Sequence, residues 1–502
     1  MKYFIPAWHK QYDDWSINIP SIENYDAAEY MTVLKKFDEE IGLIITDYQP
    51  QLLSKLNQIA FFPNTLFSVY DFLQGVHGFE NKVLELEDFN WPKNAIFDYG
   101  PFRTLIVLEN KLYATVFYDI DGHILRISYP ENDEHKAFTL GIDSRGFISN
   151  QDDEEKTIYF DPYGNWRFKK DKTTDKITVN PEMHFCKRRE YENITDLVDE
   201  ILSRYLKVNA KNNDEIIVTV DDESSFNNEI IEPYKPLYII NRHHPYSKKI
   251  GSLAKAKVIV SSNEIKQNLE KNYREQFDIS VIPVFNSEFR LGHSQRQNVQ
   301  EIGFFAENAN DENIHQIIQK LCNYILKNPD NYSLKIFTYN FWKADHVNKI
   351  LEQIKEENKN SFIIGKSEQA ENAPIDGLDD EVSLPELDVA HTRLTNISDV
   401  LSNLDKMRLL INWGKADELM QISGVSIGIP QVQNFSSVTV VDNKNGRIIK
   451  KISELLPVVD EYLTNLNSWN QTVVYNVQLM NQYSEENIIE KWKEVFKERK
   501  AE

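Results

Sequence analysis

The sequence of 502 residues contains only two cysteines, Cys186 and Cys322. So few thiols in so long a chain argue against a disulfide framework and favour a reducing compartment. The chain also lacks any run of about 18 apolar residues, the length that a membrane-spanning helix needs. Its opening apolar run is too short for a signal peptide. The sequence therefore predicts a cytoplasmic protein without a membrane span.

Basic residues are in the minority. The 56 Lys and Arg residues are outnumbered by 78 Asp and Glu residues, which gives a formal net charge of −22. Proteins that bind nucleic acid present a basic face to the phosphate backbone, so no nucleic-acid partner is expected. The composition, 41% hydrophobic and 27% charged, is typical of globular domains. A chain of this length is expected to form two or three of them.

Several motifs that carry chemistry are also absent. No Gly-x-Gly-x-x-Gly follows the first apolar strand, so a dinucleotide cofactor is not expected. A Ser-His-Asp grouping, a Walker loop and Cys/His metal spacing are missing too. The sequence therefore predicts no catalytic residue of these classes, no cofactor and no metal site.

The most regular stretch of the chain runs from Ile397 to Val432. Its pattern predicts a helix, a buried strand at 408–413, a second helix at 416–427 and a second strand at 429–432. Helices and strands that alternate with tight connections form parallel α/β units. Such sheets bind ligands outside the carboxyl ends of their strands. If the chain performs any chemistry, it is therefore expected at the loop 414–417.

The same alternation predicts a fold of two Rossmann-like halves. The first half covers 1–90 and continues over 185–285, and the second half covers 286–455. Between the two parts of the first half, residues 91–184 change to a period of two with many turn signals, which predicts an antiparallel β-meander insertion. Residues 456–502 are closing helices, one expected from about 458 to 482, and they are expected to dock on the first half.

Three residues that follow the strand at 237–240 are candidates for the edge of a cleft: Arg242, His243 and His244. Adjacent side chains that leave a strand point in opposite directions, so the two histidines cannot both reach one metal ion. A polar contact made by a single histidine is favoured over a catalytic or metal-binding pair.

The segment from Trp413 to Val432 resembles the donor site of retaining glycosyltransferases of the GT-B fold. In those enzymes two glutamates, separated by seven residues, precede a helix and a Gly-x-Pro. Gly428-Ile429-Pro430 matches the Gly-x-Pro, and the two glutamate positions then fall on Lys415 and Ser423. If the motif is aligned a few residues differently, Glu418 comes near the donor site. The resemblance implies a GT-B-like chain that lacks the carboxylates for the donor sugar and its ribose.

Other segments resemble the first subunit of the three-protein accessory secretory complex of Gram-positive bacteria. They are residues 3–8 (YFIPAW), 47–51 (DYQPQ), 88–92 (DFNWP), 144–149 (SRGFIS), 417–423 (DELMQIS) and 428–432 (GIPQV). This resemblance implies a glycosyltransferase-like subunit without transferase activity. An active retaining GT-B glycosyltransferase that modifies a cell-surface or secreted protein is the alternative.

The same resemblance implies partners and a location. The expected partners are an esterase-like subunit, a carbohydrate-binding subunit, an accessory Sec motor ATPase and a glycosylated serine-rich repeat adhesin that is exported. To bind the inner face of the plasma membrane, the chain needs a local basic cluster, because its negative net charge opposes binding to anionic lipid. The candidates for a membrane patch are Lys187, Arg188 and Arg189, together with Lys248 and Lys249. A solvated face and phosphate contacts are the alternatives for these residues.

Overall fold

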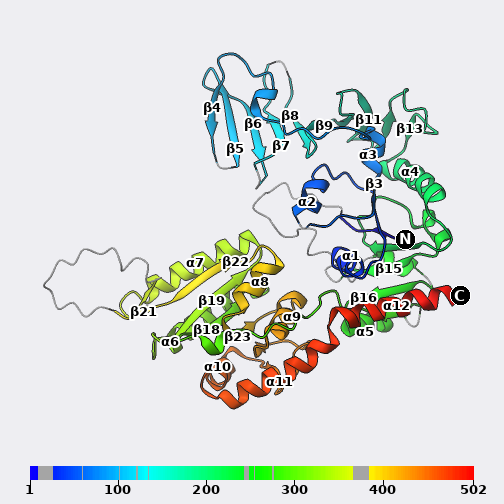
Figure 1. Cartoon of the computed structure of the whole chain (residues 1–502). Helices are drawn as coiled ribbons and strands as arrows, with labels where there is room; N and C mark the ends of the chain where they lie inside the picture. The colour runs from blue at the N-terminus through cyan, green and yellow to red at the C-terminus, as the bar shows by residue number, and fades with distance from the viewer. Residues whose placement is uncertain are drawn as a thin grey trace. The chain divides into compact units, whose positions relative to one another are not determined.

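The computed structural model describes residues 1–8, 26–58, 60–100, 102–119, 122–133, 135–241, 248–253, 255–273, 276–365 and 384–501 (Figure 1). These residues form two compact units. The first contains most of the chain up to Val281, and the second contains most of the chain from Ile282 onward. Each unit has a parallel sheet with helices on its faces, and the first also carries an antiparallel sheet.

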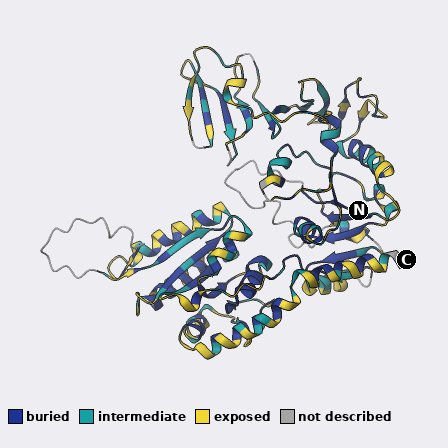
Figure 2. Cartoon of the chain, viewed as in Figure 1, coloured by how far each residue is buried: buried dark blue, intermediate teal, exposed yellow. Residues whose placement is uncertain are grey.

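A seven-stranded sheet forms the body of the first unit, and all of its pairings are parallel. In spatial order its strands are β17 (Asp278–Val281), β16 (Lys257–Val260), β15 (Leu237–Ile240), β14 (Glu215–Val220), β1 (Lys2–Ile5), β2 (Ile41–Ile45) and β3 (Thr65–Ser68). Every residue of β2, β14 and β15 is buried, as expected for parallel strands covered on both faces (Figure 2). β1 and β14 are neighbours although the insertion separates them in sequence.

Helices connect these strands: α1 (Asp26–Lys36), α2 (Leu52–Gln58), α3 (Val69–Gln74), α4 (Ile194–Asn209) and α5 (Asn263–Tyr273). The start of α4 follows from a capping residue, since the Asn193 side chain accepts a hydrogen bond from the Asp196 backbone N–H at 3.0 Å. Apolar residues at helical spacing then bury one face of α4 in the core of the unit.

The insertion is a ten-stranded antiparallel meander, in which strands adjacent in sequence are adjacent in space. The strands are β4 (Ile96–Tyr99), β5 (Arg103–Leu108), β6 (Lys111–Tyr118), β7 (Ile124–Tyr129), β8 (Phe138–Asp143), β9 (Phe147–Asp153), β10 (Lys156–Phe160), β11 (Trp166–Asp171), β12 (Ile177–Val179) and β13 (Glu190–Tyr191). The expected fold class is therefore confirmed: parallel α/β sheets with an antiparallel β insertion.

The segments 47–51 and 144–149 hold the insertion against the body of the first unit. The Ser144 backbone N–H donates to the Pro50 carbonyl at 2.9 Å, and the Gln51 side chain donates to the Ile142 carbonyl at 2.7 Å. Arg145 donates two hydrogen bonds to the carboxylate of Asp71 on α3, both 2.8 Å long. Two of the motifs that suggested a family thus have a structural role, because they fix the insertion on the sheet.

The second unit contains a six-stranded parallel sheet. In spatial order its strands are β22 (Val389–Arg393), β19 (Tyr332–Thr338), β18 (Gln300–Phe305), β23 (Met407–Asn412), β24 (Gln431–Gln433) and β25 (Gly446–Ile448). A short separate pair is formed by β20 (Ile363–Ile364) and β21 (Glu386–Leu387). The helices of the second unit are α6 (Asp311–Ile325), α7 (Phe341–Glu357), α8 (Ile397–Leu404), α9 (Glu418–Ile427), α10 (Leu455–Thr464), α11 (Leu466–Gln482) and α12 (Glu485–Ala501).

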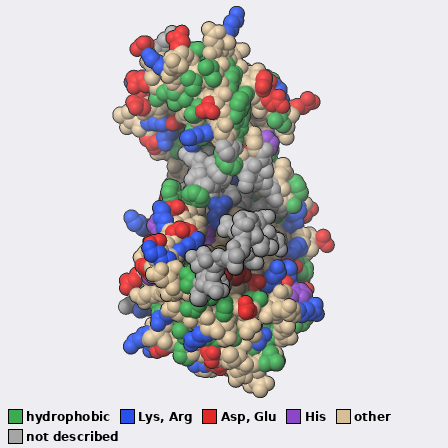
Figure 3. All heavy atoms as spheres, turned by 90° about the vertical axis from the view of Figure 1, so that its left-hand side faces the viewer, with side chains coloured by type: hydrophobic (Ala, Val, Ile, Leu, Met, Phe, Trp, Pro, Cys, Tyr) green, Lys and Arg blue, Asp and Glu red, His purple; other side chains and the backbone are tan. Residues whose placement is uncertain are grey.

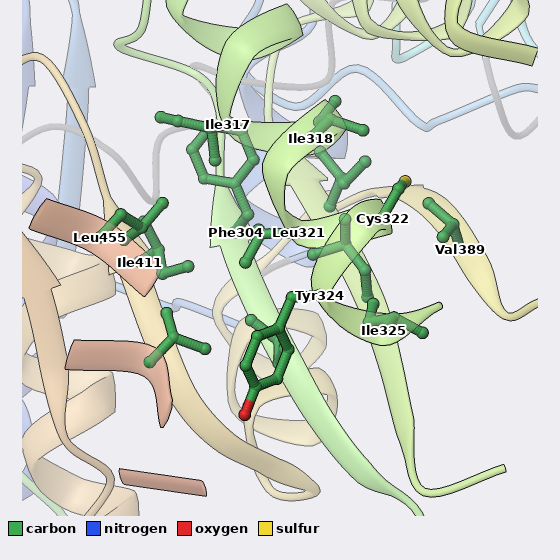
Figure 4. Close-up of a cluster of buried hydrophobic side chains, with 14 of the residues drawn as sticks. Phe304, Ile317, Ile318, Leu321, Cys322, Tyr324, Ile325, Val389, Ile411 and Leu455 are labelled. Atoms are coloured by element: carbon green, nitrogen blue, oxygen red, sulfur yellow. The ribbon is translucent and has the colours of Figure 1, made fainter. Parts of the chain in front are cut away.

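The core of the second unit lies between its sheet and the helices α6, α7 and α10. Figure 4 shows side chains of α6 such as Ile318 and Leu321 gathered with Phe304 of β18 and Ile411 of β23. These four residues are fully buried, and each contributes about 1.5–3 kcal/mol through the surface removed from water. At the border of the cluster, the Tyr324 hydroxyl donates to the Asp460 carboxylate at 2.8 Å.

The closing segment differs from the single helix expected at 458–482. It forms two helices, α10 and α11, which meet at Asn465. Asn465 has an extended conformation (φ −101°, ψ 96°), and its side chain caps α11 by accepting from the N–H groups of Asn467 and Ser468. The expectation was wrong because neither glycine nor proline marks this break. The docking of the closing helices on the first half stays a prediction.

Candidate functional site

The loop 414–417, the place expected for any chemistry, follows the carboxyl end of β23 and enters α9. Gly414 has a φ of +103°, and a Cβ placed on it would lie 2.0 Å from the carbonyl oxygen of Asn308. Only glycine allows the loop to approach this neighbour so closely. Asp417 then caps α9, because its carboxylate accepts from the Met420 backbone N–H at 2.8 Å.

Hydrogen bonds tie together the loops that follow three neighbouring strands, β18, β19 and β23. The Glu307 carboxylate accepts from the backbone N–H groups of Tyr339 (2.8 Å) and Asn340 (3.1 Å). The Tyr339 hydroxyl donates to the Asp417 carboxylate at 3.3 Å. The Asn308 side chain donates to the Lys415 carbonyl at 3.3 Å. The carboxyl edge of this sheet, at which parallel folds bind ligands, is thus tied by its own loops.

The two carboxylates at this edge accept hydrogen bonds from backbone N–H groups, and Asp417 also accepts one from the Tyr339 hydroxyl. Burial raises the pKa of Glu307 above its ordinary value of 4.5, and its two backbone hydrogen bonds oppose that rise. Asp417 accepts from its own helix and from Tyr339. Each carboxylate therefore stabilises a loop or a helix start by hydrogen bonding.

The structure places the three expected donor-site residues in different environments. Lys415 is exposed in the loop, and Glu418 is partly buried in the first turn of α9. Burial is the main cause that raises the pKa of Tyr483, and the charge of Glu418 adds to it. Ser423 is only 3% exposed, inside α9. A side chain at position 423 therefore cannot join Lys415 at the surface of the loop without a rearrangement of the helix.

A network of buried amides, which the sequence pattern did not predict, lies behind this loop. Asn412, at the end of β23, donates to Gln431 of β24 at 3.1 Å. Gln431 donates to the Gln421 carbonyl at 2.8 Å, and the Gln421 side chain donates to Gln433 at 2.7 Å. Ser437 accepts from both Gln421 (3.0 Å) and Gln433 (3.1 Å). The four amide side chains are at most 2% exposed.

Glycine at position 424 makes room for this network. A Cβ on Gly424 would lie 2.6 Å from the Nε2 atom of Gln431. The alternation Gln431-Val432-Gln433 was the available signal, since both amides fall on one face of a strand. Buried amides must be hydrogen-bonded, so they rigidify this edge of the sheet and fill it with protein atoms.

Arg242, His243 and His244 lie outside the described residues, so their role at a cleft edge stays a prediction. The strand before them, β15, is buried and parallel to its neighbours.

The candidate membrane residues occupy two sites of the first unit. Lys187, Arg188 and Arg189 are exposed, and Arg189 donates to the Asn180 carbonyl at 3.1 Å. Lys248 is exposed, whereas Lys249 is partly buried and donates to the Ser224 carbonyl at 3.3 Å. On the face that Figure 3 shows, Lys and Arg side chains are interspersed with Asp and Glu.

The described part of the chain offers neither a membrane span nor a metal cluster. None of its helices has both the length and the apolar composition that crossing a membrane requires. Within those same residues, no three His, Cys, Asp or Glu side chains come together as a possible metal-binding group.

With a parallel sheet and its own core in each unit and an antiparallel sheet in the first, the chain has a fold similar to the GT-B fold of glycosyltransferases. The pneumococcal O-GlcNAc transferase GtfA, solved with UDP and GlcNAc, has this fold: the TM-score is 0.63 at 13% identity, over 99% of this chain and 98% of that chain. At this identity the similarity concerns the fold.

The chain belongs to the family of the first accessory secretory protein of the accessory Sec system, whose model matches residues 1–499. The family member of Streptococcus gordonii is 27% identical, over 99% of each chain. A chain of the "Glycosylation Associate Protein (Gap123) complex" of Streptococcus agalactiae has a TM-score of 0.78 at 22% identity, over 98% of this chain and 99% of that chain. A chain in the structure of accessory secretory proteins 1, 2 and 3 of Streptococcus pneumoniae has a TM-score of 0.76 at 21% identity, over 99% and 100%.

Proposed function

We propose that this chain is a non-catalytic subunit of an accessory secretion complex. It assembles with an esterase-like and a carbohydrate-binding subunit, and the complex serves a dedicated motor ATPase. The cargo is a glycosylated serine-rich repeat adhesin of a Gram-positive bacterium. The chain acts in the cytoplasm, bound peripherally at the inner face of the plasma membrane. Membership of the accessory Sec family supports this role, as do the relatives solved as complexes of several proteins.

The observation that carries the proposal of a non-catalytic role is the set of contacts between loops at the carboxyl edge of the second sheet. Three loops are hydrogen-bonded to one another there, and buried amides fill the space behind them. A donor nucleotide sugar would have to break these contacts and leave buried polar groups unpaired. Each such group costs about 1–3 kcal/mol.

The side chains at the expected donor positions favour the same conclusion. A retaining transferase uses two carboxylates there, and this chain has Lys415 and Ser423. The lysine cannot accept hydrogen bonds from sugar hydroxyls, since an ammonium group has donors only. The alternative of an active retaining transferase would require other carboxylates to reach the donor.

Turnover of nucleotide sugars tests the non-catalytic role. The purified chain, alone and with its partner subunits, is incubated with UDP-N-acetylglucosamine or UDP-glucose, and release of UDP is measured. We expect release no faster than in buffer. An active GT-B transferase is the positive control. Turnover that a Lys415→Ala substitution abolishes would establish the alternative. Weak binding of UDP without turnover agrees with the proposal, because Lys415 attracts phosphate.

Assembly is tested separately from catalysis. Large apolar side chains are exposed on both units, among them Ile96 (65%), Tyr99 (70%) and Trp342 (60%), as expected of surfaces that meet a partner. We expect the three subunits, when co-expressed, to elute together in size-exclusion chromatography, with an interface above about 2,000 Å² in total. Separate elution at micromolar concentration would contradict the proposed complex, whatever the result of the turnover assay.

A further inference from the structure

A line of polar side chains crosses the middle of the insertion sheet. It consists of Thr115, Ser128, Thr139, Asp152 and Thr157, which are direct neighbours on the strands β6 to β10. Residues directly opposite each other on adjacent strands project from the same face. The five side chains therefore form one continuous row, called here the transverse row.

Hydrogen bonds hold the transverse row together. The hydroxyls of Ser128 and Thr139 are 3.1 Å apart. The Asp152 carboxylate accepts from the Thr157 hydroxyl through one oxygen and from the Lys172 ammonium, at 2.8 Å, through the other. Lys172 thus neutralises Asp152, which lies between Thr139 and Thr157 in the row.

The two faces of this part of the sheet differ in how they are covered. On the face opposite the row, Ile106, Ala114, Val116 and Ile127 are buried under apolar residues of the segment 84–97. The face of the row is hollowed instead. The hollow has a volume of about 420 Å³ and is lined by four residues of the row and by apolar side chains. Sites for small ligands have volumes of about 300–1,000 Å³.

A β-bulge supplies an apolar wall of this hollow. The register of β5 and β6 shifts between the pairs Ile106↔Ala114 and Val107↔Leu112. The shift turns Leu112 to the side of Thr115, and Leu112 is 46% exposed. Tyr129, Pro130, Ala137 and Phe138 also line the hollow. The lining of the hollow therefore combines hydroxyls with apolar and charged side chains.

The geometry restricts the class of ligand. An extended peptide that adds to a sheet needs free backbone groups, but β6 to β9 are interior strands paired on both sides. An anion is disfavoured, because the carboxylates of Asp153 and Glu154 also line the hollow. A neutral ligand with many hydroxyls and apolar ring faces fits, since hydroxyls both donate and accept hydrogen bonds.

We propose that this hollow binds a neutral saccharide over the transverse row. The ring hydroxyls bond to Ser128, Thr139 and Asp152, and an apolar ring face lies against Leu112 and Pro130. This site goes beyond the proposed function, which requires no ligand on this face of the insertion. It is also separate from the carboxyl edge of the second sheet, because every residue that lines it belongs to the insertion.

The test uses the full chain and a panel of neutral disaccharides: cellobiose, maltose and N,N′-diacetylchitobiose. Glucuronic acid is the anionic probe. Binding is followed by saturation-transfer NMR and isothermal titration calorimetry. We expect at least one disaccharide to bind with a Kd on the order of 1 mM, and glucuronic acid to bind at least tenfold more weakly.

Three variants locate the site. Thr139→Val removes one hydroxyl and keeps the β-branched shape, and Asp152→Asn removes the charge. Leu112→Trp fills the hollow from an exposed position without changing the row. Each is expected to weaken binding at least tenfold. Thr178→Val, an exposed position on β12, is the matched control and should leave the Kd unchanged. Unfolding midpoints verify that all four variants are folded.

Two results would overturn the proposal. One is the absence of binding by every disaccharide at 50 mM. The other is binding that neither Thr139→Val nor Leu112→Trp weakens in folded protein. A Ser/Thr-rich peptide that binds where no saccharide does, and loses binding with the same variants, would identify the hollow as a peptide site and would equally reject the proposal.

Discussion

Gly414 and the carbonyl of Asn308 are so close that a single added carbon atom would collide with the backbone, 2.0 Å from the oxygen. The two residues belong to loops that follow the neighbouring strands β23 and β18. The two loops are therefore packed directly against each other at the carboxyl edge of this sheet.

This contact predicts that the addition of a single methyl group at position 414 strongly lowers stability. Gly414→Ala is expected to lower the free energy of unfolding by about 2–3 kcal/mol, because alanine is strained at a φ of +103° and its Cβ meets a backbone atom. Gly164→Ala is the control: its φ is +85°, but nothing lies within 4 Å of the added carbon. It should lose only about 1–2 kcal/mol. Equal losses in urea unfolding would show that the approach to Asn308 has no effect.

The buried amide network predicts a loss of stability without a change in volume. In Gln431→Leu, the buried Asn412 amide loses its acceptor, and the Gln421 carbonyl loses the hydrogen bond that the Gln431 side chain donates. We expect a loss of about 1–3 kcal/mol in urea unfolding. Gln353→Leu, on the exposed side of α7, removes only a surface hydrogen bond and is expected to change stability by at most about 0.5 kcal/mol. If Gln431→Leu leaves the free energy of unfolding unchanged, the network does not contribute to stability.

Glu307 predicts a dependence of stability on pH. Burial raises the pKa of its carboxyl above 4.5, so at mildly acidic pH the folded state binds more protons than the unfolded state. The free energy of unfolding then falls as the pH rises from the ordinary pKa of 4.5 through the raised pKa of the folded state. Glu307→Gln removes this titration. The stability difference, variant minus wild type, should become more positive between pH 4 and pH 7.

Ile318→Val is the control for that series, because it changes a core side chain and no titrating group. Its difference from the wild type should stay constant over the same pH range, at a loss of about 0.5–1.5 kcal/mol. A Glu307→Gln difference that is equally constant, or that falls with pH, would contradict a raised pKa at this carboxyl.

The contact between the insertion and the body of the first unit predicts that a substitution of Arg145 strongly lowers the free energy of unfolding. Its guanidinium donates to Asp71 and to Asp143, and Asp143 is only 2% exposed. Arg145→Met leaves the Asp143 carboxylate buried without its cation, so a loss of about 3–5 kcal/mol is expected. Lys136→Met removes an exposed pair with Glu155 and should cost at most about 1 kcal/mol. Similar unfolding midpoints for the two variants would refute the structural role of Arg145.

The sequence predicts those features of the fold whose signals lie in residues close together in the chain. The helix and strands at 397–432 were predictable because their signals are local: Asn396 caps α8, and Gly428, with a φ of +84°, ends α9. The antiparallel insertion was predictable from its period of two and its turns. The break at Asn465 was not, because an asparagine within a helical pattern has no unique meaning until its side chain is seen to cap.

The candidate site was predictable only in part. The sequence places Lys415 in a loop at a carboxyl edge, since that follows from the order of strands. It cannot show that Gln421, Gln431 and Asn412 meet, because their contacts join different elements and depend on which faces they present. The contacts between these loops and amides are tertiary, and local patterns contain no information about them.

The last prediction concerns attachment to anionic lipid. Lys187, Arg188 and Arg189 are consecutive and exposed, and each basic residue near an anionic surface contributes on the order of 1 kcal/mol. The net charge of −22 opposes binding, but charges beyond a Debye length of about 10 Å at 0.1 M salt are screened. We expect the chain to float with phosphatidylglycerol liposomes and not with neutral ones, and to be released by 1 M salt.

Charge reversal separates a local patch from the net charge. The triple variant with Glu at Lys187, Arg188 and Arg189 should lose most of the flotation. The control reverses three exposed lysines of the second unit, which are Lys327, Lys349 and Lys359. Both variants change the net charge equally, so the control should float nearly as well as the wild type if the patch is responsible. Equal losses in the two variants would mean that only the net charge matters. Flotation that is the same on neutral liposomes, or that persists in 1 M salt, would show that attachment is not electrostatic.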